Sequence, residues 1–329
     1  MKIAVVGAGL SGLVVAEQLS QYADVSVFEK SRGYGGRMAT KRLEPYCFDH
    51  GTQFFTAKSP VFRSWLQPWL ARGVVACWHA TFAEICGDQV LRYQPWDNHY
   101  PHYVGVPGMN ELARQVARPL NVQLNTLVKK VSYDQRWQLY SETGLLADGF
   151  DVLVLALPPV QAANLLPNDN SLVATLMDTS MLGCFSLLLG FEQLPHQRFD
   201  VALVRGLDIS WLSLNHTKPG RQSLPSIVVH ATNRWANAHL NQPAKEVTAY
   251  MLAEATKVLG YDTSKADVQY LHPWKYANIP RVSQKEMFLE HPTQPLLCCG
   301  DWNKQGRVEA AFLSGYAVAQ RLKQQIGIA

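Results

Sequence analysis

Hydrophobic residues at the start of the chain follow two patterns that belong to different kinds of secondary structure. Residues 3–6 and 25–28 are short, wholly apolar runs, which are typical of parallel strands buried on both faces. Between them, apolar side chains recur at helical spacing over residues 11–22. This strand, helix, strand unit predicts the beginning of a doubly wound sheet with a right-handed crossover.

Later hydrophobic runs divide the chain between that sheet and a second unit. Residues 151–157 and 296–299 predict two more buried strands of the first sheet. Helices are expected over 61–70, 110–117, 244–259 and 309–325, and strands over 122–131, 137–140, 185–191, 209–214 and 227–230. We therefore predict an α/β fold, with a first domain of residues 1–58, 104–160 and 290–329 and an interleaved α+β domain of residues 59–103 and 161–289.

The composition excludes several classes of protein. With 47% hydrophobic and 17% charged residues and a net charge of +4 over 329 residues, neither disorder nor nucleic-acid binding is expected. The six cysteines form no CxxC pair, which indicates reduced thiols and no metal site. Early glycines and Glu17 argue against a signal peptide, and no apolar run is long enough to span a membrane. We therefore expect a cytoplasmic protein.

A glycine-rich turn joins the first predicted strand to the first helix. The spacing of Gly7, Gly9 and Gly12 suits a tight turn, close approach of a pyrophosphate and close packing of the helix. Glu29 ends the second strand, where a carboxylate binds a ribose diol and repels a 2′-phosphate, which favours FAD or NAD. Glycines that serve packing alone are the alternative. With strand, helix and acid all present, the turn predicts a dinucleotide site.

Two further segments have the chemistry that the same ligand needs. A cationic, glycine-rich stretch follows Glu29, and its arginines Arg32 and Arg37 can bind a pyrophosphate in bidentate geometry. Near the other end, Asp301 follows an apolar strand and can bind ribitol hydroxyls, and a helix opening near Val308 stabilises negative charge on a reduced flavin. A solvated basic turn and an ordinary capped helix are the alternatives. We expect the two ends of the chain to meet around one cofactor.

Six ordered segments carry a resemblance to a known family, at residues 30–38, 49–57, 104–109, 230–235, 272–276 and 299–315. In them the chain resembles the FAD-dependent amine-oxidase superfamily, and most closely its bacterial renalase-like branch. The resemblance implies a Rossmann-like FAD-binding domain with an interleaved substrate domain, the amine-oxidase or p-hydroxybenzoate hydroxylase-like architecture. It implies an oxidase with noncovalent FAD that passes a hydride from off-pathway dihydro isomers of NAD(P)H to flavin and then to oxygen, giving NAD(P)+ and hydrogen peroxide.

The resemblance and the motifs together identify candidate contacts of the cofactor. These cofactor-binding candidates are Gly7, Ala8, Gly9, Leu10, Ser11, Gly12, Glu29, Lys30, Arg32, Gly35, Gly36, Arg37, Met38, Thr52, Gln53, Phe54, Val128, Gly300, Asp301, Arg307 and Val308.

Aromatic residues of the second domain are expected to orient a flat substrate beside the flavin. Oxidation of a dihydropyridine needs orientation and no general base, so we predict no catalytic residue besides the cofactor. Core packing is the alternative for each tryptophan. If residues 272–276 are extended, Lys275 points away from the face that carries Trp274 and Tyr276. The predicted substrate-binding residues are Trp211, Asn215, His230, Trp235, Trp274 and Tyr276.

Two other functions remain open at this stage. A flavin amine oxidase acting on a small amine would share the fold and would produce peroxide with amines. A non-enzymatic binding protein of the same fold would be colourless. The neighbours Asp49 and His50 diverge in an extended segment, so we expect Asp49 to be structural and the pair not to be catalytic. The expected partners are a small-molecule substrate and molecular oxygen, with no nucleic acid and no membrane.

Overall fold

The predicted central strands lie together in a six-stranded sheet. A computed structural model describes residues 1–280, 286–304 and 306–328. Its strand β1 (Lys2–Val6) pairs in parallel with both β2 (Asp24–Phe28) and β13 (Val152–Leu155), so the chain returns to the first sheet as the apolar runs predict. The order across the sheet is β19 (Leu289–Glu290), β20 (Leu296–Cys298), β13, β1, β2 and β9 (Asn121–Gln123).

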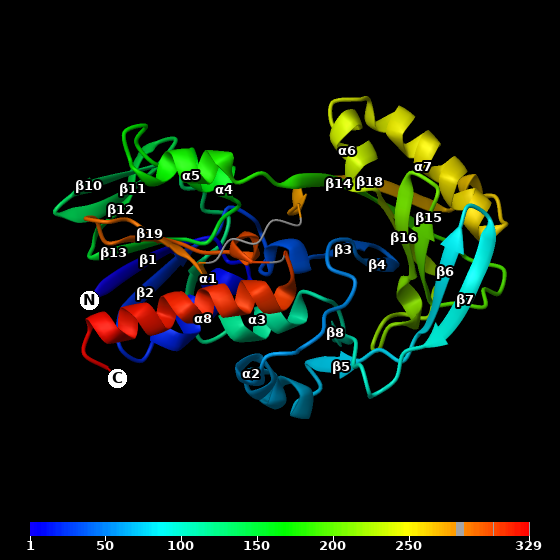
Figure 1. The fold of residues 1–329 in the computed structure, drawn as a ribbon, viewed down its shortest axis with the longest axis horizontal. Helices are drawn as coiled ribbons and strands as arrows, with labels where there is room; N and C mark the ends of the chain where they lie inside the picture. Colours follow the sequence, from blue (N-terminus) through cyan, green and yellow to red (C-terminus); the bar gives the residue numbers. More distant parts are fainter. Residues whose placement is uncertain (281–285, 305, 329) are drawn as a thin grey trace.

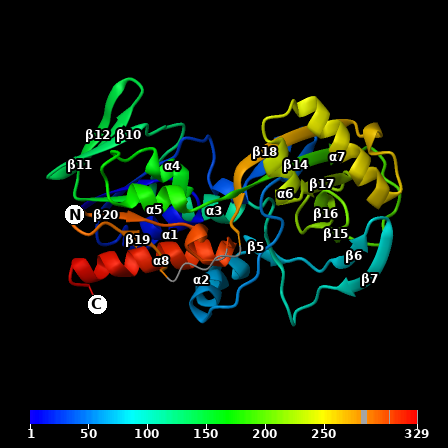
Figure 2. The same ribbon diagram turned by 45° about the horizontal axis from the view of Figure 1, so that its top comes forward.

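Both faces of this sheet are buried, as its uninterrupted apolar strands require (Figures 1 and 2). Ile3 and Val5 pack in one core with α1 (Leu10–Leu19), α3 (Glu111–Ala117) and α8 (Val308–Gln325). Ala4 and Val6 face the opposite core. That second core is closed by α4 (Pro159–Ala163), α5 (Leu172–Asp178) and a small sheet of β10 (Lys130–Asp134), β11 (Arg136–Ser141) and β12 (Gly144–Phe150).

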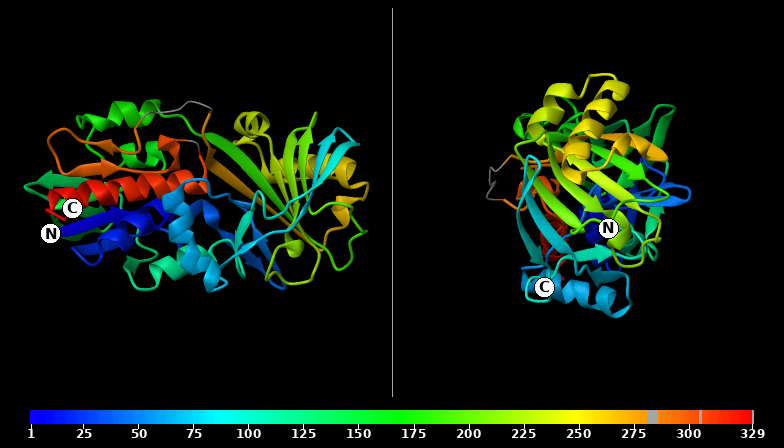
Figure 3. Two further views of the ribbon diagram at one scale, coloured as in Figure 1. Left: turned by 60° about the horizontal axis from the view of Figure 1, so that its bottom comes forward. Right: turned by 90° about the vertical axis from the view of Figure 1, so that its right-hand side faces the viewer.

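A seven-stranded sheet forms the other half of the molecule (Figure 3). Its order is β18 (Val268–Asn278), β14 (Leu182–Gly190), β17 (Ser226–Ala231), β16 (Ile209–Leu214), β15 (Val201–Arg205), β6 (Thr81–Cys86) and β7 (Gln89–Pro95). Helices α6 (Asn233–His239) and α7 (Ala244–Leu259) cover one face through an apolar core. The hairpin of β3 (Thr40–Leu43) and β4 (Tyr46–Asp49) packs on the other face.

The segment between the two large sheets belongs to both halves. Helix α2 (Pro60–Ala71) packs on α8, where the ring centroids of Phe62 and Phe312 are 4.9 Å apart. After it, β5 (Val75–Cys77) pairs with β8 (Tyr103–Gly105). The domain boundaries remain a prediction, and residues 281–285 of the second domain lie outside the described residues. Single 3-10 turns occur at η1 (Gly36–Met38), η2 (Asn215–Thr217), η3 (Thr263–Lys265) and η4 (Asp301–Asn303).

The predicted strand over residues 122–131 is wrong as a single element. The chain turns at Asn125, which has a φ of 53°, so that β9 joins the first sheet and β10 joins the small one. The turn is held beside β2, because Thr126 donates a backbone hydrogen bond of 2.8 Å to the Glu29 carbonyl oxygen. None of the described helices is long and apolar enough to cross a lipid bilayer.

Candidate functional site

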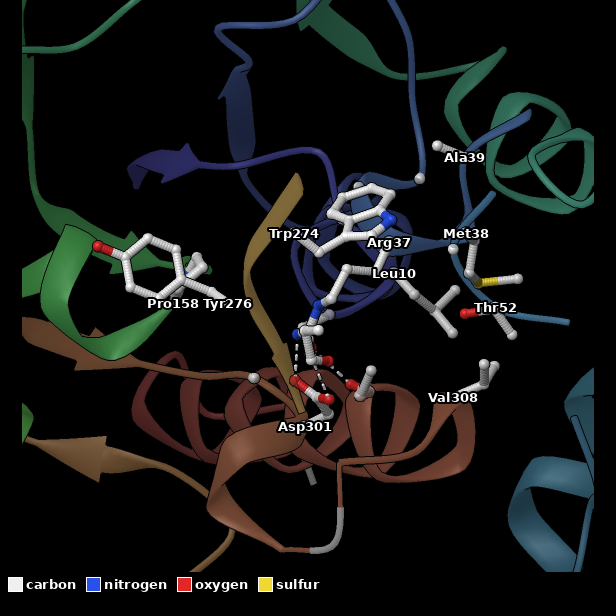
Figure 4. A pocket seen from close by; sticks show the side chains of 18 of the residues that line it. Leu10, Arg37, Met38, Ala39, Thr52, Pro158, Trp274, Tyr276, Asp301 and Val308 are labelled. Carbon is white, nitrogen blue, oxygen red and sulfur yellow. Dashed lines mark hydrogen bonds and ion pairs between the residues drawn. The ribbon is translucent and has the colours of Figure 1, made fainter. Parts of the chain in front are cut away.

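A cavity of about 1870 Å³ lies where the first sheet, the start of α8 and the seven-stranded sheet meet (Figure 4). It is large enough for a dinucleotide together with a second flat molecule. All the predicted cofactor-binding residues line it except Ala8 and Gly12. Four of the six predicted substrate-binding residues also line it, namely Trp211, His230, Trp274 and Tyr276.

The three glycines of the first turn have three different reasons to lack a side chain. Gly7 has a φ of 106°, and a Cβ there would lie 2.5 Å from the Ala156 carbonyl oxygen. A Cβ on Gly12 would lie 2.1 Å from the Gly7 carbonyl oxygen, so Gly12 serves the packing of α1 and does not line the cavity. Gly9 has an ordinary extended backbone, with φ −71° and ψ 171°, and its Cβ would meet no atom within 4 Å. The fold therefore does not need glycine at Gly9, whereas a ligand lying against this backbone does.

Glu29 is held at the edge of the cavity by the backbone around it. Its Oε2 accepts a hydrogen bond of 2.8 Å from the Ala8 N–H, and its Oε1 accepts one of 2.8 Å from the Ser31 N–H. Ala8 is fully buried, so the prediction that it contacts a ligand directly is corrected: it positions Glu29 instead. The carboxylate keeps further lone pairs for a diol that enters the cavity.

The first and last segments of the chain meet through an ion pair between Arg37 and Asp301. The Arg37 guanidinium donates from Nη1 to Asp301 Oδ2 at 2.8 Å and from Nη2 to Asp301 Oδ1, and Nη1 also donates to the Ala277 carbonyl oxygen at 3.2 Å. Figure 4 shows this pair at the cavity wall. Arg37 therefore ties η1, η4 and the end of β18 together.

Helix α8 points its N-terminus into the cavity. Arg307 to Ala311 line the wall, and no described side chain caps the first turn. The helix lies close to the glycine turn because Gly315 has no side chain: a Cβ there would lie 2.3 Å from the Ser11 carbonyl oxygen. Ser11 also donates from Oγ to the Ala311 carbonyl oxygen at 2.8 Å. The positive ends of α1 and α8 thus face one space, which favours an anionic ligand.

Across the cavity, one row of side chains crosses the seven-stranded sheet. His272 of β18 is registered with Ser186 of β14, Ser186 with His230 of β17, and His230 with Trp211 of β16. Cross-strand partners share a face, so all four point to the cavity side. The burial of β18 alternates as predicted, with Lys275 exposed between the half-buried Trp274 and Tyr276, but Lys275 also lines the cavity, so the prediction that it points away from the site is not confirmed.

Two of the predicted substrate-binding residues do not reach the cavity. Trp235 lies on α6, on the opposite face of the sheet, where its ring stacks 4.9 Å from Tyr250. Asn215 is fully buried and braces the hairpin: its Oδ1 accepts from the Asp49 N–H at 3.2 Å and its Nδ2 donates to the Cys47 carbonyl oxygen at 2.8 Å. A substrate contact is therefore wrong for both residues, because the tertiary packing occupies their side chains.

A buried cluster of charges behind the row is not indicated by any sequence motif. The Asp49 carboxylate is fully buried and contacts Lys218 Nζ at 3.3 Å and Arg221 Nη2 at 2.6 Å. Burial would raise the pKa of Asp49, but Lys218 and Arg221 lower it to about 2. Asp49 is structural, as expected, since it also accepts from Thr40 and from the Met109 backbone. The charged partners of Asp49 lie far from it in the chain, so the residues near Asp49 in the sequence do not indicate them.

His50 is buried and His230 is half-buried at the cavity wall, and the pKa of each imidazole is lowered, so both are neutral at pH 7. Burial, with His272 adding to it, lowers the pKa of His50 to about 3; burial, with Lys218 adding to it, lowers that of His230 to about 4. His50 stacks on Trp274 with centroids 5.1 Å apart. His50 and Asp49 do not form a catalytic pair, because the Asp49 carboxylate binds Lys218 and Arg221.

Acid is expected to destabilise the fold through these two histidines. In the unfolded chain each binds a proton near pH 6.5, whereas the folded state excludes it until about pH 3 to 4. The free energy of unfolding should therefore fall by about 1.4 kcal/mol per pH unit for each histidine as the pH drops from 6.5 toward 4. Urea titrations at pH 7, 6 and 5 measure this slope. The variant His50→Gln should show a shallower slope, and an unchanged slope would contradict the assignment.

The comparisons with known proteins agree with this geometry. Residues 5–69 match the NAD(P)-binding Rossmann-like domain, and residues 66–323 match the flavin containing amine oxidoreductases, which is most of the chain. The chain belongs to the flavin-containing amine oxidoreductase family. The flavin of this family, FAD, fits the cavity described here, since the open space at Gly9 and the two helix N-termini suit its pyrophosphate.

Solved structures of this family share the fold across the whole chain. Putrescine oxidase bound to putrescine is similar with a TM-score of 0.73 and 14% identity, covering 98% of this chain and 99% of that one. Cyclohexylamine oxidase from Brevibacterium oxydans IH-35A has a TM-score of 0.73 and 13% identity, covering 99% of both chains. A 4,4′-diapophytoene desaturase of Staphylococcus aureus (strain Newman) is 46% identical over 52 residues, which are 16% of this chain and 10% of the desaturase. The matched part spans only a tenth of that relative.

Proposed function

We propose that this flavin-containing oxidoreductase is a renalase-like oxidase of off-pathway dihydro isomers of NAD(P)H. The products would be NAD(P)+ and, with molecular oxygen as the acceptor, hydrogen peroxide. The bound flavin would supply the two-electron chemistry, and the chain would bind and orient the two ligands. We place the protein in the cytoplasm, in agreement with six cysteines that are all free thiols.

The distribution of charge in the cavity carries this proposal. Among the described residues, three carboxylates line the cavity, and each already has partners: Glu29 binds two backbone N–H groups, Asp301 binds Arg37, and Glu309 accepts from the Lys58 and Ser59 N–H groups. Glu29, Asp301 and Glu309 come from the end of β2, η4 and α8, and none of the described carboxylates that line the cavity comes from the seven-stranded sheet, so none stands on the substrate side to attract an ammonium group. The substrate side presents aromatic rings, imidazoles and the ammonium groups of Lys41 and Lys275, which suit a flat, uncharged ring and disfavour an ammonium substrate.

The chain's own residues would have distinct tasks around the two ligands. Gly9, Glu29 and the N-termini of α1 and α8 would hold the dinucleotide, together with the other predicted cofactor contacts that line the cavity. Trp211 and Phe54, with ring centroids 5.6 Å apart, would pack against the substrate ring. Hydride transfer from a dihydropyridine releases no proton, so the neutral state of His230 is compatible with it.

The protonation state of the cysteine that lines the cavity supports noncovalent binding of FAD. Among the described lining residues, Cys184 is the one cysteine. Burial raises the pKa of its thiol to about 12, so the thiolate that would attack a flavin is not formed at neutral pH. The protein should therefore release intact FAD on denaturation.

The test of this function is anaerobic reduction of the purified yellow protein by a panel of donors. The 2- and 6-dihydro isomers should bleach the flavin rapidly, while NADH and simple amines such as putrescine should act weakly. Peroxide should then form in proportion to donor when oxygen is admitted. Rapid bleaching by an amine and none by the isomers would replace the proposal with amine oxidation, and a colourless protein that takes up no FAD would indicate a binding protein.

Trp274→Ala is expected to slow flavin reduction while sparing the flavin. The indole lies at the cavity wall, stacks on His50 and donates from Nε1 to the His50 carbonyl oxygen at 2.9 Å. Losing this ring should slow anaerobic reduction roughly tenfold, about 1.4 kcal/mol. Trp235→Phe is the matched control, because Trp235 lies on the opposite face and should leave the rate unchanged. Loss of FAD in Trp274→Ala would show that Trp274 supports the cofactor instead.

A further inference from the structure

The buried charge cluster behind the cavity contains one more cation than anion. Lys218 and Arg221 have side chains that are at most 1% exposed, and both bind the single carboxylate of Asp49. Arg221 also donates to the Gly105 and Pro219 carbonyl oxygens. Lys218 has a different second partner, the side-chain oxygen of Gln53, at 3.1 Å. Because Asp49 neutralises only one of the two cations, the cluster has a surplus positive charge, and the hydrogen bond to Gln53 helps to stabilise the Lys218 ammonium.

The hydrogen-bond donors fix the orientation of the Gln53 amide. A lysine ammonium only donates, so the oxygen Oε1 of Gln53 must face Lys218. The amide nitrogen then faces the Asp49 and Gly51 carbonyl oxygens and, at 3.4 Å, Nε2 of His230. Because that nitrogen carries only donors, a hydrogen on His230 Nε2 would point at another donor. This contact favours a bare Nε2 on His230, with the ring's hydrogen on Nδ1, although the His50 carbonyl oxygen also lies near the ring as an acceptor.

We propose that Lys218 is a positioning residue that acts through Gln53 on His230. The ammonium and the oriented amide together keep the His230 imidazole neutral, with a bare Nε2, in the row that lines the substrate side of the cavity. The row places His230 between Ser186 and Trp211. The catalytic consequence rests on the proposed function: the substrate ring becomes a pyridinium cation on oxidation, and a neutral imidazole does not repel it.

The charged and titratable neighbours of His230 agree with this assignment. Lys218 is the charged group that adds to burial in lowering the pKa of His230 to about 4, whereas Lys41 lowers the pKa of His272 and His50. The two lysines thus act on different histidines of the same wall. The titratable and charged groups around His230 are Asp49 and His50 at the end of β4, Lys218 and Arg221 after η2, Cys184 on β14 and His272 on β18.

The tautomer and the titration of His230 test the proposal without any substrate. In protein labelled with ¹⁵N-histidine, long-range ¹H–¹⁵N spectra report which ring nitrogen carries hydrogen, and His230→Asn assigns the signal. The wild type should show the Nδ1–H form and no titration between pH 7.5 and 5. In Lys218→Met the pKa of His230 should rise by about one pH unit. This variant should still fold, because Asp49 retains Arg221, Thr40 and the Met109 N–H as partners.

Lys41→Met is the matched control, since it should raise the pKa values of His272 and His50 and leave the pKa of His230 unchanged. An Nε2–H tautomer in the wild type would overturn the proposal even if Lys218→Met did not fold. The proposal would also be overturned if the pKa of His230 were unchanged in folded Lys218→Met, or if Lys41→Met shifted that pKa by the same amount. Anaerobic reduction by a dihydronicotinamide isomer should become slower in Lys218→Met than in wild type only below pH 6. If no donor reduces the flavin, the proposed function fails while the spectra still decide the role of Lys218.

Discussion

Gly9→Val should give a folded but colourless protein. The backbone at Gly9 is extended and a Cβ there would meet no atom within 4 Å, so we expect valine to be accommodated without loss of the fold. In the holoprotein that space would hold the cofactor's pyrophosphate, and the valine methyl groups would exclude it. We expect FAD affinity to fall roughly a hundredfold, about 3 kcal/mol, or more. Flavin absorbance after purification and FAD titration of the apoprotein measure the loss, with circular dichroism as the check on folding.

Gly12→Val provides the contrasting variant three residues along the same turn. Its Cβ would lie 2.1 Å from the Gly7 carbonyl oxygen, so the substitution should prevent α1 from packing on the sheet and should leave little folded protein. The two variants separate ligand binding from folding within one motif. If Gly9→Val retains full flavin content, the first turn is not the place where the pyrophosphate binds.

Asp301→Leu is expected to lower both the stability and the flavin content. Asp301 is 6% exposed, and its removal leaves the Arg37 guanidinium without its carboxylate in a partly buried site. Unfolding should become easier by about 2 kcal/mol, since water still reaches part of Arg37, and FAD affinity should fall roughly a hundredfold. Thermal melting and flavin titration report the two effects separately.

The double variant Arg37→Met with Asp301→Leu distinguishes two reasons for the lost flavin. Removing both charges leaves no unpaired ion, so stability should return most of the way to the wild type. FAD affinity should stay low if Asp301 or Arg37 contacts the cofactor directly. Recovery of FAD binding in the double variant would show instead that Asp301 matters only because it restrains Arg37.

The cofactor half could be predicted well because its signals are local. The turn at Gly7 to Gly12 lies between a strand and a helix, whose hydrophobic residues repeat with different periods, and Glu29 directly follows the next strand. Parallel strands that are buried on both faces show as unbroken apolar runs, which identified β1, β2, β13 and β20. The two ends of the chain meet as predicted, but the ion pair that joins them, between Arg37 and Asp301 264 residues apart, is not predicted by the sequence.

The substrate half could not be predicted at the same level. Strand β17 is buried on both faces, with α7 on one side and the cavity and hairpin on the other, so no alternation of polar and apolar residues marks which side each residue takes. The sequence therefore does not show which face of the sheet Trp235 and Trp211 take. In the structure, α6 places Trp235 on the face opposite the cavity. Asn215, which the sequence suggests as a partner for a substrate amide, instead braces the hairpin through Asp49 and Cys47.

The amino-acid sequence alone determined the doubly wound sheet, the glycine turn and the acid that follows it, because hydrophobic period and backbone conformation act over a few neighbouring residues. Only the tertiary structure decided which histidines and tryptophans face the cavity and that Lys218 stands behind Gln53. Those relations depend on strand register and on loops that are brought together across more than 160 residues, where each buried charge must find its partner in three dimensions.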